Sequence, residues 1–331
     1  MIKPNLFSYA TSELSQDAFL CWFIAWADPT CEKLDTSLHH AAVRFLKLMF
    51  SKHGIDMPLI KSLQIKRQVD NMDVFVVMNE TYALIIEDKT YTNEHSNQLT
   101  KYRITTEQKE IYKNILPIYY KTGNQSDYTK VYDAGYQVIK RSEMIELLEK
   151  GLNRIRSDIY NDYYRHLMHL EKRYQRFRSL PMDQWDHYSW HGFYTELQKH
   201  FAGNWGFVSN PRGGFEGFWW NFRRLENCRL HLQLEQDKLC IKIHVPTKQD
   251  QSRLRNKWYK KIMKEASHYE LNITKPARFR AGNTMTTAVF GDDYRKSNDG
   301  LIDLNETIKL LKKAEHFLNS LIQTSGENIK T

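Results

Sequence analysis

The segment YALIIEDKT, residues 82–90, joins an apolar run to the charged residues Glu87, Asp88 and Lys89. Charged side chains at the end of a buried strand cost free energy unless another group pairs with them or uses them. Side chains alternate between the two faces of a strand, so Glu87 and Lys89 share one face and Asp88 lies on the other. The fold and the function both depend on which groups lie beside this strand end.

The preceding segment NMDVFVVM predicts an antiparallel partner strand. If Met78 pairs with Tyr82 across the loop NET, the register places Asp73 opposite Glu87. Opposed residues share a face, with Cβ atoms about 5 Å apart. The pattern therefore predicts that Asp73, Glu87 and Lys89 lie together, whereas a slip by one residue would separate them.

Two neighbouring carboxylates repel each other unless a cation lies between them. Carboxylate oxygens suit Mg²⁺ or Mn²⁺, which keep several water ligands and accept phosphate oxygens. The Lys89 ammonium could orient an attacking water or neutralise charge that develops on a phosphate. This set is typical of metal-assisted phosphodiester hydrolysis, although a salt bridge at the end of a hairpin would use the same residues.

Two expected helices add polar groups near this strand end. In NQLTKY, Gln98 and Tyr102 are spaced i, i+4 and share a helix face. They could hydrogen-bond a nucleic-acid backbone, or the helix could be solvated with a buried tyrosine. Glu13 lies in the first turn of an apolar helix, where it either interacts with the helix dipole or provides a third carboxylate. Asp17, one turn later, is an alternative helix acid.

These polar residues occur in one order along the chain: Glu13, Asp73, Glu87, Lys89, Gln98 and Tyr102. This order resembles the PD-(D/E)XK nuclease superfamily, and in particular its RecB-like branch with a Gln-x-x-x-Tyr helix. The resemblance covers roughly residues 5–140, with Met72 in the position of the proline that names the motif. It implies a restriction-endonuclease-like α/β core, in which helices flank a mixed sheet.

The resemblance also implies a metal centre. Asp73 and Glu87 would bind Mg²⁺ or Mn²⁺ together with the backbone carbonyl of Asp88, whose side chain points away. Glu13 would be an additional acid at the metal.

The same resemblance implies roles for the remaining motif residues. Lys89 would assist the nucleophilic water and the transition state, and Gln98 and Tyr102 would shape the site and contact the substrate. The expected function is a Mg²⁺-dependent nuclease that acts on DNA, in bacterial defence or in repair. The alternative is a catalytically silent nuclease-fold module that binds nucleic acid or a partner protein.

The pattern of elements agrees with this core. We expect helices at residues 11–28, 38–53, 94–112, 141–152 and 155–178, and strands at residues 62–69, 71–78, 81–89, 115–122 and 135–140. After Pro181 the composition shifts towards tryptophan, with a predicted meander of strands at residues 215–245. We therefore expect a nuclease domain at residues 1–180 and a C-terminal α+β domain at residues 181–331, which binds substrate or regulates the enzyme.

The second domain contains a predicted basic helix at residues 252–269. One stripe of this helix could grip phosphates or could be a solvated face: Arg253, Lys257, Lys260 and Lys264. By contrast, His187, His191 and His200 do not combine with any nearby acid into a set of metal ligands. No metal site is therefore predicted there, and the tryptophans of this domain are expected in its core.

Bulk properties of the 331-residue chain fit these expectations. The net charge of +9 suits a polyanionic partner such as nucleic acid. The four cysteines form no C-x-x-C pair and suggest no disulfide framework, so a reducing cytoplasm is expected. The longest apolar run, residues 18–27, is too short to span a bilayer, so no membrane association is expected.

Overall fold

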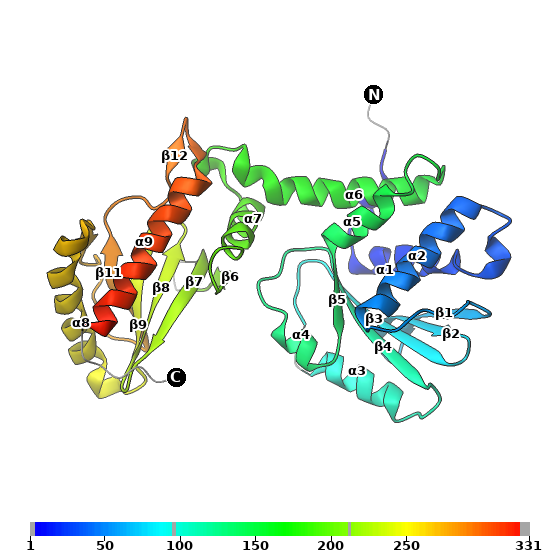
Figure 1. Ribbon diagram of the computed structural model, residues 1–331, viewed down its shortest axis with the longest axis horizontal. Coiled ribbons are helices and arrows are strands. Elements are labelled where there is room, and N and C mark those ends of the chain that lie inside the picture. Colours follow the sequence, from blue (N-terminus) through cyan, green and yellow to red (C-terminus); the bar gives the residue numbers. More distant parts are fainter. Residues whose placement is uncertain (1–3, 95–96, 211–212, 325–331) are drawn as a thin grey trace. The chain divides into compact units, whose positions relative to one another are not determined.

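The computed structural model describes residues 4–94, 97–210 and 213–324. It divides into two compact units, Met1–Lys172 and Arg173–Thr331 (Figure 1). The sequence placed a domain boundary slightly later, between residues 180 and 181. Each unit buries apolar side chains of its own, so each is described separately below.

The first unit alternates helices and strands along the chain. Its helices are α1 (Glu13–Ala25), α2 (Thr36–Lys52), α3 (Gln98–Glu107), α4 (Thr129–Asp133), α5 (Arg141–Glu149) and most of α6 (Asp158–Gln175), which ends three residues beyond Lys172. Its strands are β1 (Leu63–Val69), β2 (Met72–Met78), β3 (Tyr82–Lys89), β4 (Asn114–Lys121) and β5 (Gln137–Lys140).

The five strands form one mixed sheet in the order β1-β2-β3-β4-β5. The pairs β1/β2 and β2/β3 are antiparallel, whereas β3/β4 and β4/β5 are parallel. A parallel pair needs a long crossover, and α3 provides it between β3 and β4. The expected α/β class, a mixed sheet flanked by helices as in restriction endonucleases, is therefore confirmed.

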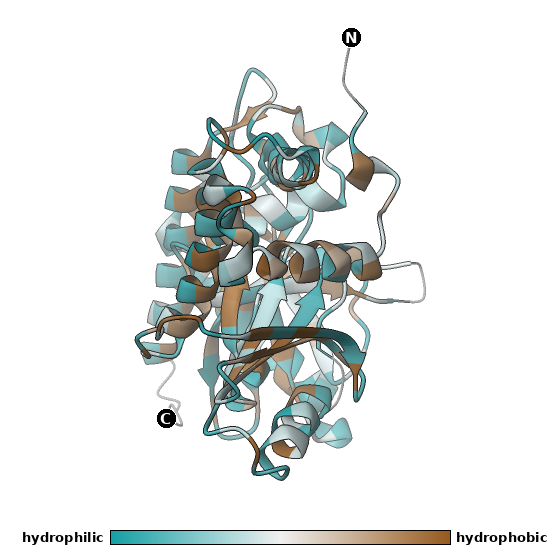
Figure 2. Cartoon of the chain, turned by 90° about the vertical axis from the view of Figure 1, so that its right-hand side faces the viewer, coloured by the Kyte–Doolittle hydropathy of each residue, from teal (hydrophilic) through white to brown (hydrophobic). Residues whose placement is uncertain are grey.

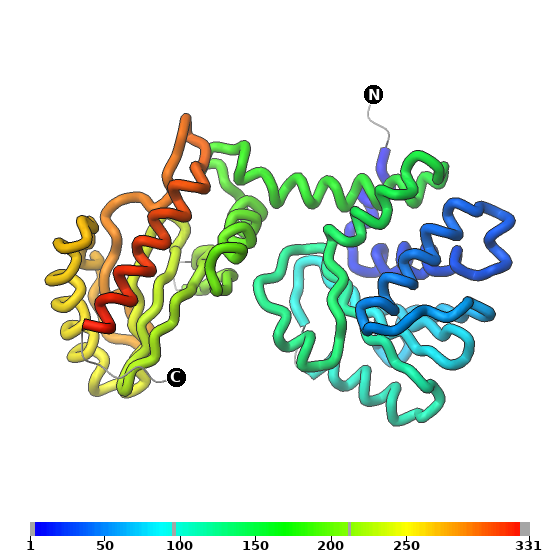
Figure 3. Tube along the Cα trace, viewed as in Figure 1, coloured from blue at the N-terminus to red at the C-terminus, as the bar shows by residue number. Residues whose placement is uncertain are grey.

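The two faces of the sheet have separate apolar cores, which is the pattern of a strand buried on both sides. Val76 and Ile86 pack in the core that contains α1 and α2 residues. Phe75 and Ile85 point to the opposite face and pack with Leu99 of α3. The Cα trace in Figure 3 shows α1 and α2 on one side of this sheet and α3 on the other. Odd-numbered residues of β2 and β3 therefore face α3.

Helix α1 is the apolar segment noted in the sequence. It begins after Ser12 and buries Phe19, Leu20, Phe23 and Ile24 against the sheet. Figure 2, coloured by hydropathy, shows helices that carry both apolar and polar residues. Within the described ranges, no helix is long and apolar enough to cross a membrane.

Helix α3 is shorter than the sequence predicted. The predicted helix at residues 94–112 includes residues 95 and 96, which lie outside the described residues. At its other end the chain leaves the helix after Glu107, and Glu110 adopts a left-handed conformation with φ 51°. A helix cannot continue through such a residue.

The second unit is an α+β arrangement. Its main helices and strands are α7 (His187–Leu197), β6 (Gly203–Val208), β7 (Phe215–Arg224), β8 (Arg229–Glu235), β9 (Lys238–His244), α8 (Gln251–Ala266), β10 (Ile273–Thr274), β11 (Thr284–Phe290), β12 (Ser297–Asn298), β13 (Leu301–Ile302) and α9 (Leu304–Gln323). Six strands form an antiparallel sheet in the order β10-β11-β9-β8-β7-β6.

One face of this second sheet carries the core of the unit. Alternate residues of β8, Leu230, Leu232 and Leu234, pack with apolar residues of the three long helices. Trp220 and Trp258 are fully buried there, in agreement with the expectation that tryptophans form the core. The meander β7-β8-β9 and helix α8 were expected, whereas α7, β6, β11 and α9 were not.

Candidate active site

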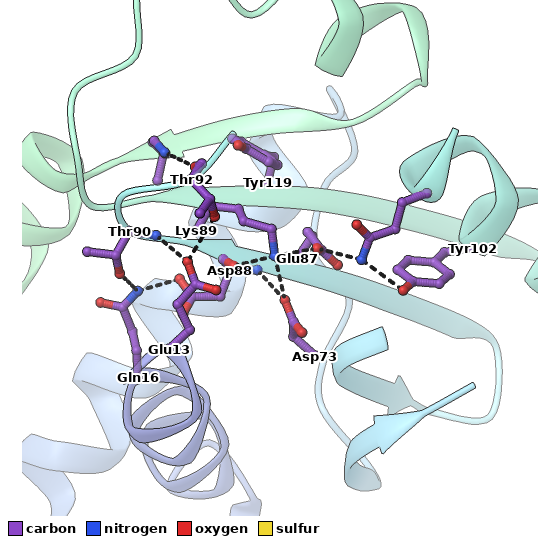
Figure 4. Close-up of polar contacts among 12 residues, drawn as sticks. Glu13, Gln16, Asp73, Glu87, Asp88, Lys89, Thr90, Thr92, Tyr102 and Tyr119 are labelled. Carbon is purple, nitrogen blue, oxygen red and sulfur yellow. Dashed lines mark hydrogen bonds and ion pairs between the residues drawn. The ribbon is translucent and has the colours of Figure 1, made fainter. Parts of the chain in front are cut away.

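The β2–β3 hairpin brings two acids and a lysine together. Met78 pairs with Tyr82, as the sequence predicted, and the register runs to Val74 opposite Ile86, so Asp73 and Glu87 follow directly at that end. The Lys89 Nζ lies 2.6 Å from Glu87 Oε1 and 3.6 Å from Asp73 Oδ2. Figure 4 shows the three side chains converging at this strand end. We call this group the acid cluster.

Glu87 is the most deeply buried member of the acid cluster, with 1% of its side chain exposed. Its Oε1 accepts a hydrogen bond from Gln98 Nε2 at 3.1 Å. Its Oε2 is also buried but has no hydrogen-bond partner among the described residues. Burial and the Asp73 carboxylate raise the pKa of Glu87 to about 7, although Lys89 opposes this shift. A buried, unpaired carboxylate oxygen beside a second acid is a suitable ligand for a cation.

Asp73 and Lys89 are fixed by the backbone of β3. Asp73 Oδ2 accepts a hydrogen bond from the Asp88 backbone N at 2.9 Å. Lys89 Nζ donates to the Asp88 carbonyl oxygen at 3.0 Å. Burial lowers the pKa of Lys89, but the Glu87 and Asp73 carboxylates outweigh burial and raise it above its ordinary value. Lys89 is therefore charged, and its ammonium is held beside the two carboxylates of the acid cluster.

The Asp88 side chain lies on the opposite face of the sheet, as the alternation predicted. Its Oδ1 accepts a hydrogen bond from Gln16 Nε2 of α1. Gln16 Oε1 in turn accepts one from the Tyr163 hydroxyl at 3.2 Å. Burial and the Asp17 carboxylate raise the pKa of Asp88 well above its ordinary value. This side chain therefore anchors α1 to β3 and does not join the acid cluster.

Helix α1 brings two further acids to this end of the sheet. Glu13 Oε1 accepts hydrogen bonds from the Thr90 backbone N at 3.0 Å and from Thr92 Oγ1 at 3.3 Å. Asp17 is buried, and its Oδ1 has no hydrogen-bond partner in the part of the chain that the structure describes. Burial and Asp73 raise the pKa of Asp17 to about 7. Both helix acids thus lie near the acid cluster.

Helix α3 provides the amide and the phenol that the sequence singled out. Gln98 Nε2 donates to Glu87 Oε1 and also, at 2.8 Å, to the Tyr102 hydroxyl. Tyr102 is buried in the core on this face of the sheet. Gln98 therefore fixes the orientation of the Glu87 carboxylate, and Tyr102 fixes the orientation of Gln98. Contact of either residue with a substrate stays a prediction.

Sequence reasoning missed Lys121. It ends β4 and pairs in register with Lys89 at the end of the parallel neighbour β3. Its Nζ donates to the Thr92 carbonyl, and burial lowers its pKa to about 8 despite the nearby Glu13. The signal was present in the sequence, because two neighbouring parallel strands that both end in lysine bring those lysines to the same edge of the sheet.

The basic stripe of the second unit lies on α8. All four of its members are exposed: Arg253, Lys257, Lys260 and Lys264. Arg253 forms an ion pair with Asp250 at 2.6 Å. The buried Trp258 faces the core on the other side of the helix. The stripe is therefore a charged surface, and contact with nucleic acid stays a prediction.

Comparison with known proteins identifies the family. The family model of the PD-(D/E)XK nuclease superfamily matches residues 4–175. This match covers more than half of the chain and includes the whole acid cluster, so the chain belongs to the PD-(D/E)XK nuclease superfamily. Proteins of this superfamily typically use divalent metal ions, and membership supports a nuclease-type function in general. Comparisons with curated proteins and with solved structures found no match.

Proposed function

We propose that the first unit is a Mg²⁺-dependent nuclease that hydrolyses phosphodiester bonds in DNA. The observation that carries this proposal is the buried, unpaired Glu87 Oε2, which lies beside Asp73 and a charged lysine. Family membership over residues 4–175 supports the same reaction class.

The residues of the acid cluster fit a hard divalent cation. Asp73 and Glu87 would hold Mg²⁺ or Mn²⁺ with the Asp88 carbonyl, since these are oxygen donors. Glu13 would add a carboxylate from α1. When bound, the ion would activate a water molecule and neutralise charge on the phosphate. The buried, unpaired Glu87 Oε2 beside the Asp73 carboxylate supports the assignment, because a cation between two carboxylates would offset their repulsion.

The chain's own residues perform the remaining tasks. The Lys89 ammonium, held beside Glu87 and Asp73, would neutralise charge that develops on the phosphate. Gln98 keeps Glu87 in one orientation through its amide, and Tyr102 keeps Gln98 in place. This Gln-x-x-x-Tyr arrangement favours the RecB-like branch of the superfamily.

DNA is proposed as the substrate by analogy with that branch. The net charge of +9 and the exposed stripe on α8 support a polyanionic substrate. The stripe would contact phosphates without reading sequence. A role in defence against foreign DNA or in repair is part of the same analogy.

Cleavage of supercoiled and linear DNA by the purified full chain tests the proposal, with RNA as a parallel substrate. Cleavage of DNA should require Mg²⁺ or Mn²⁺ and should stop when a chelator is added. Lys89→Ala should lower the rate by roughly 10²–10³-fold, since it removes a preorganised charge. Lys150→Ala, on an exposed lysine directly after α5, is the matched control and should cut normally.

Two results would contradict the proposal. If the Lys89→Ala variant cleaves DNA at the wild-type rate and with the wild-type metal dependence, Lys89 has no role in the mechanism. DNA binding without metal-dependent cutting of any substrate would favour the alternative of a catalytically silent binding module.

A further inference from the structure

A second group of possible metal ligands lies in the second unit, on α7 and β7. His187 and His191 are spaced i, i+4, so their rings project from one face of α7. Glu216 lies on β7, and its side chain points to the core face that Phe218 shares. The sequence predicted no set of metal ligands from His187, His191 and His200 with a nearby acid, but the structure brings the first two to Glu216. The acid was missed because it lies on a strand 25 residues beyond His191.

The three side chains converge on one point. His187 Nδ1 lies 2.9 Å from Glu216 Oε1, and His191 Nε2 lies 3.0 Å from Glu216 Oε2. One ligand atom from each residue can be chosen so that all lie within 4.8 Å of one another. A tetrahedral zinc ion at about 2.0–2.1 Å from each ligand separates the ligands by roughly 3.3 Å. Small rotations of the side chains would therefore suffice to bind one.

The surroundings hold two of the three ligands in place. Glu216 is 7% exposed, and its backbone carbonyl accepts a hydrogen bond from the Tyr194 hydroxyl at 3.0 Å. The His191 ring packs against Trp205, with ring centroids 4.3 Å apart. His187 is half exposed, so the group is open to solvent on one side. Buried ligands with one open side are the arrangement of a site that keeps a position for water.

The two imidazole rings lie close together above one carboxylate. The centroids of the His187 and His191 rings lie 3.9 Å apart. Each ring places one nitrogen beside a different oxygen of Glu216. Hydrogen bonds alone would explain the contacts, but a metal ion would use all three groups at once.

We propose that His187, His191 and Glu216 form a Zn²⁺ site that connects α7 to β7. Imidazole nitrogens with one carboxylate favour zinc and similar transition metals over Mg²⁺, which prefers oxygen. The site is therefore chemically different from the acid cluster of the first unit. It also lies outside the family match, which ends at residue 175.

Metal titration of the untagged full chain tests this site. The protein is stripped with chelator, given excess Mg²⁺ to occupy the acid cluster, and titrated with Zn²⁺ against a chromophoric competitor. Wild type should bind one equivalent, and His191→Ala should bind at least 100-fold more weakly. His200→Ala, on an exposed histidine of the same unit, and Glu87→Gln should both bind like wild type.

Two further readouts identify the ligands and guard against misfolding. X-ray absorption at the zinc edge should show imidazole scattering in wild type that decreases in His187→Ala, whose half-exposed ring can be removed with little loss of packing. Zinc should raise the thermal unfolding midpoint of wild type but not of this variant. Absence of zinc binding by wild type would overturn the proposal. Equal affinity in wild type and in both histidine variants would also overturn it.

Discussion

At the scale of single residues, charge at the end of β3 is accommodated because each charged group has a different environment. Lys89 neutralises Glu87, while the Asp88 side chain is buried on the other face against Gln16. Alternation along the strand made this separation predictable. The unpaired Glu87 Oε2 was not predictable, because it depends on how Gln98 approaches from α3.

His231 on β8 gives a prediction about pH and stability in the second unit. It is 4% exposed, and burial together with positive neighbours such as Arg229 and Lys242 lowers its pKa to about 4. The unfolded chain therefore takes up a proton near its ordinary pKa of 6.5, before the folded chain does. Stability from this group is complete above that value and is lost as the pH falls towards 4.

His231→Gln should remove most of this pH dependence. Between pH 7 and pH 5 the wild type should lose about 2 kcal/mol more unfolding free energy than the variant. Denaturant unfolding followed by tryptophan fluorescence measures this difference. His200→Gln, on an exposed histidine, should behave like wild type, and an equal pH slope in His231→Gln would contradict the assignment.

At the scale of elements, helices α2 and α8 were predictable because their apolar residues recur with helical periodicity. Helix α1 and the β2–β3 hairpin were predictable as apolar runs bounded by capping or turn residues. Helix α7 was missed because its sequence, HYSWHGFYTEL, is rich in aromatic residues and contains a glycine, which hides the helical pattern. Strand β6 begins with Gly203, and the first half of β11, TMTT, carries three polar threonines. The contact of α7 with Glu216 is tertiary, so no local pattern predicts it.

The connection of α1 to β3 provides a prediction at this scale. Gln16 links Asp88 of β3 to Tyr163 of α6. Gln16→Ala would leave both of these buried groups without this partner, at a cost of about 1–3 kcal/mol. Hydrogen exchange of the β3 amides should accelerate accordingly. Leu14→Ala, on an exposed residue of the same helix, should change exchange little, and equal exchange in the two variants would contradict this connection.

At the scale of the whole molecule, the chain has two units with separate cores. The sequence indicated this division through the change of composition after Pro181. The role of the second unit could not be derived from its fold, because folds do not specify function. We predict that it contributes to DNA binding through the α8 stripe.

Deletion of the second unit tests that prediction. A fragment of residues 1–175, which keeps α6 whole, should still cut DNA with Mg²⁺. Its KM should rise by roughly tenfold or more, and its salt dependence should be weaker, because phosphate contacts are lost. Steady-state cleavage at several salt concentrations measures both effects. Higher activity of the fragment would instead indicate that the second unit restrains the nuclease, and unchanged KM would indicate no contribution to binding.

The central claim is that Asp73 and Glu87 hold a divalent cation beside Lys89. Anomalous scattering from Mn²⁺-soaked crystals of the full chain tests it most directly. We predict a manganese peak within coordination distance of both carboxylates, and loss of that peak in Asp73→Asn. Wild-type crystals with manganese peaks elsewhere, but none between Asp73 and Glu87, would contradict the account.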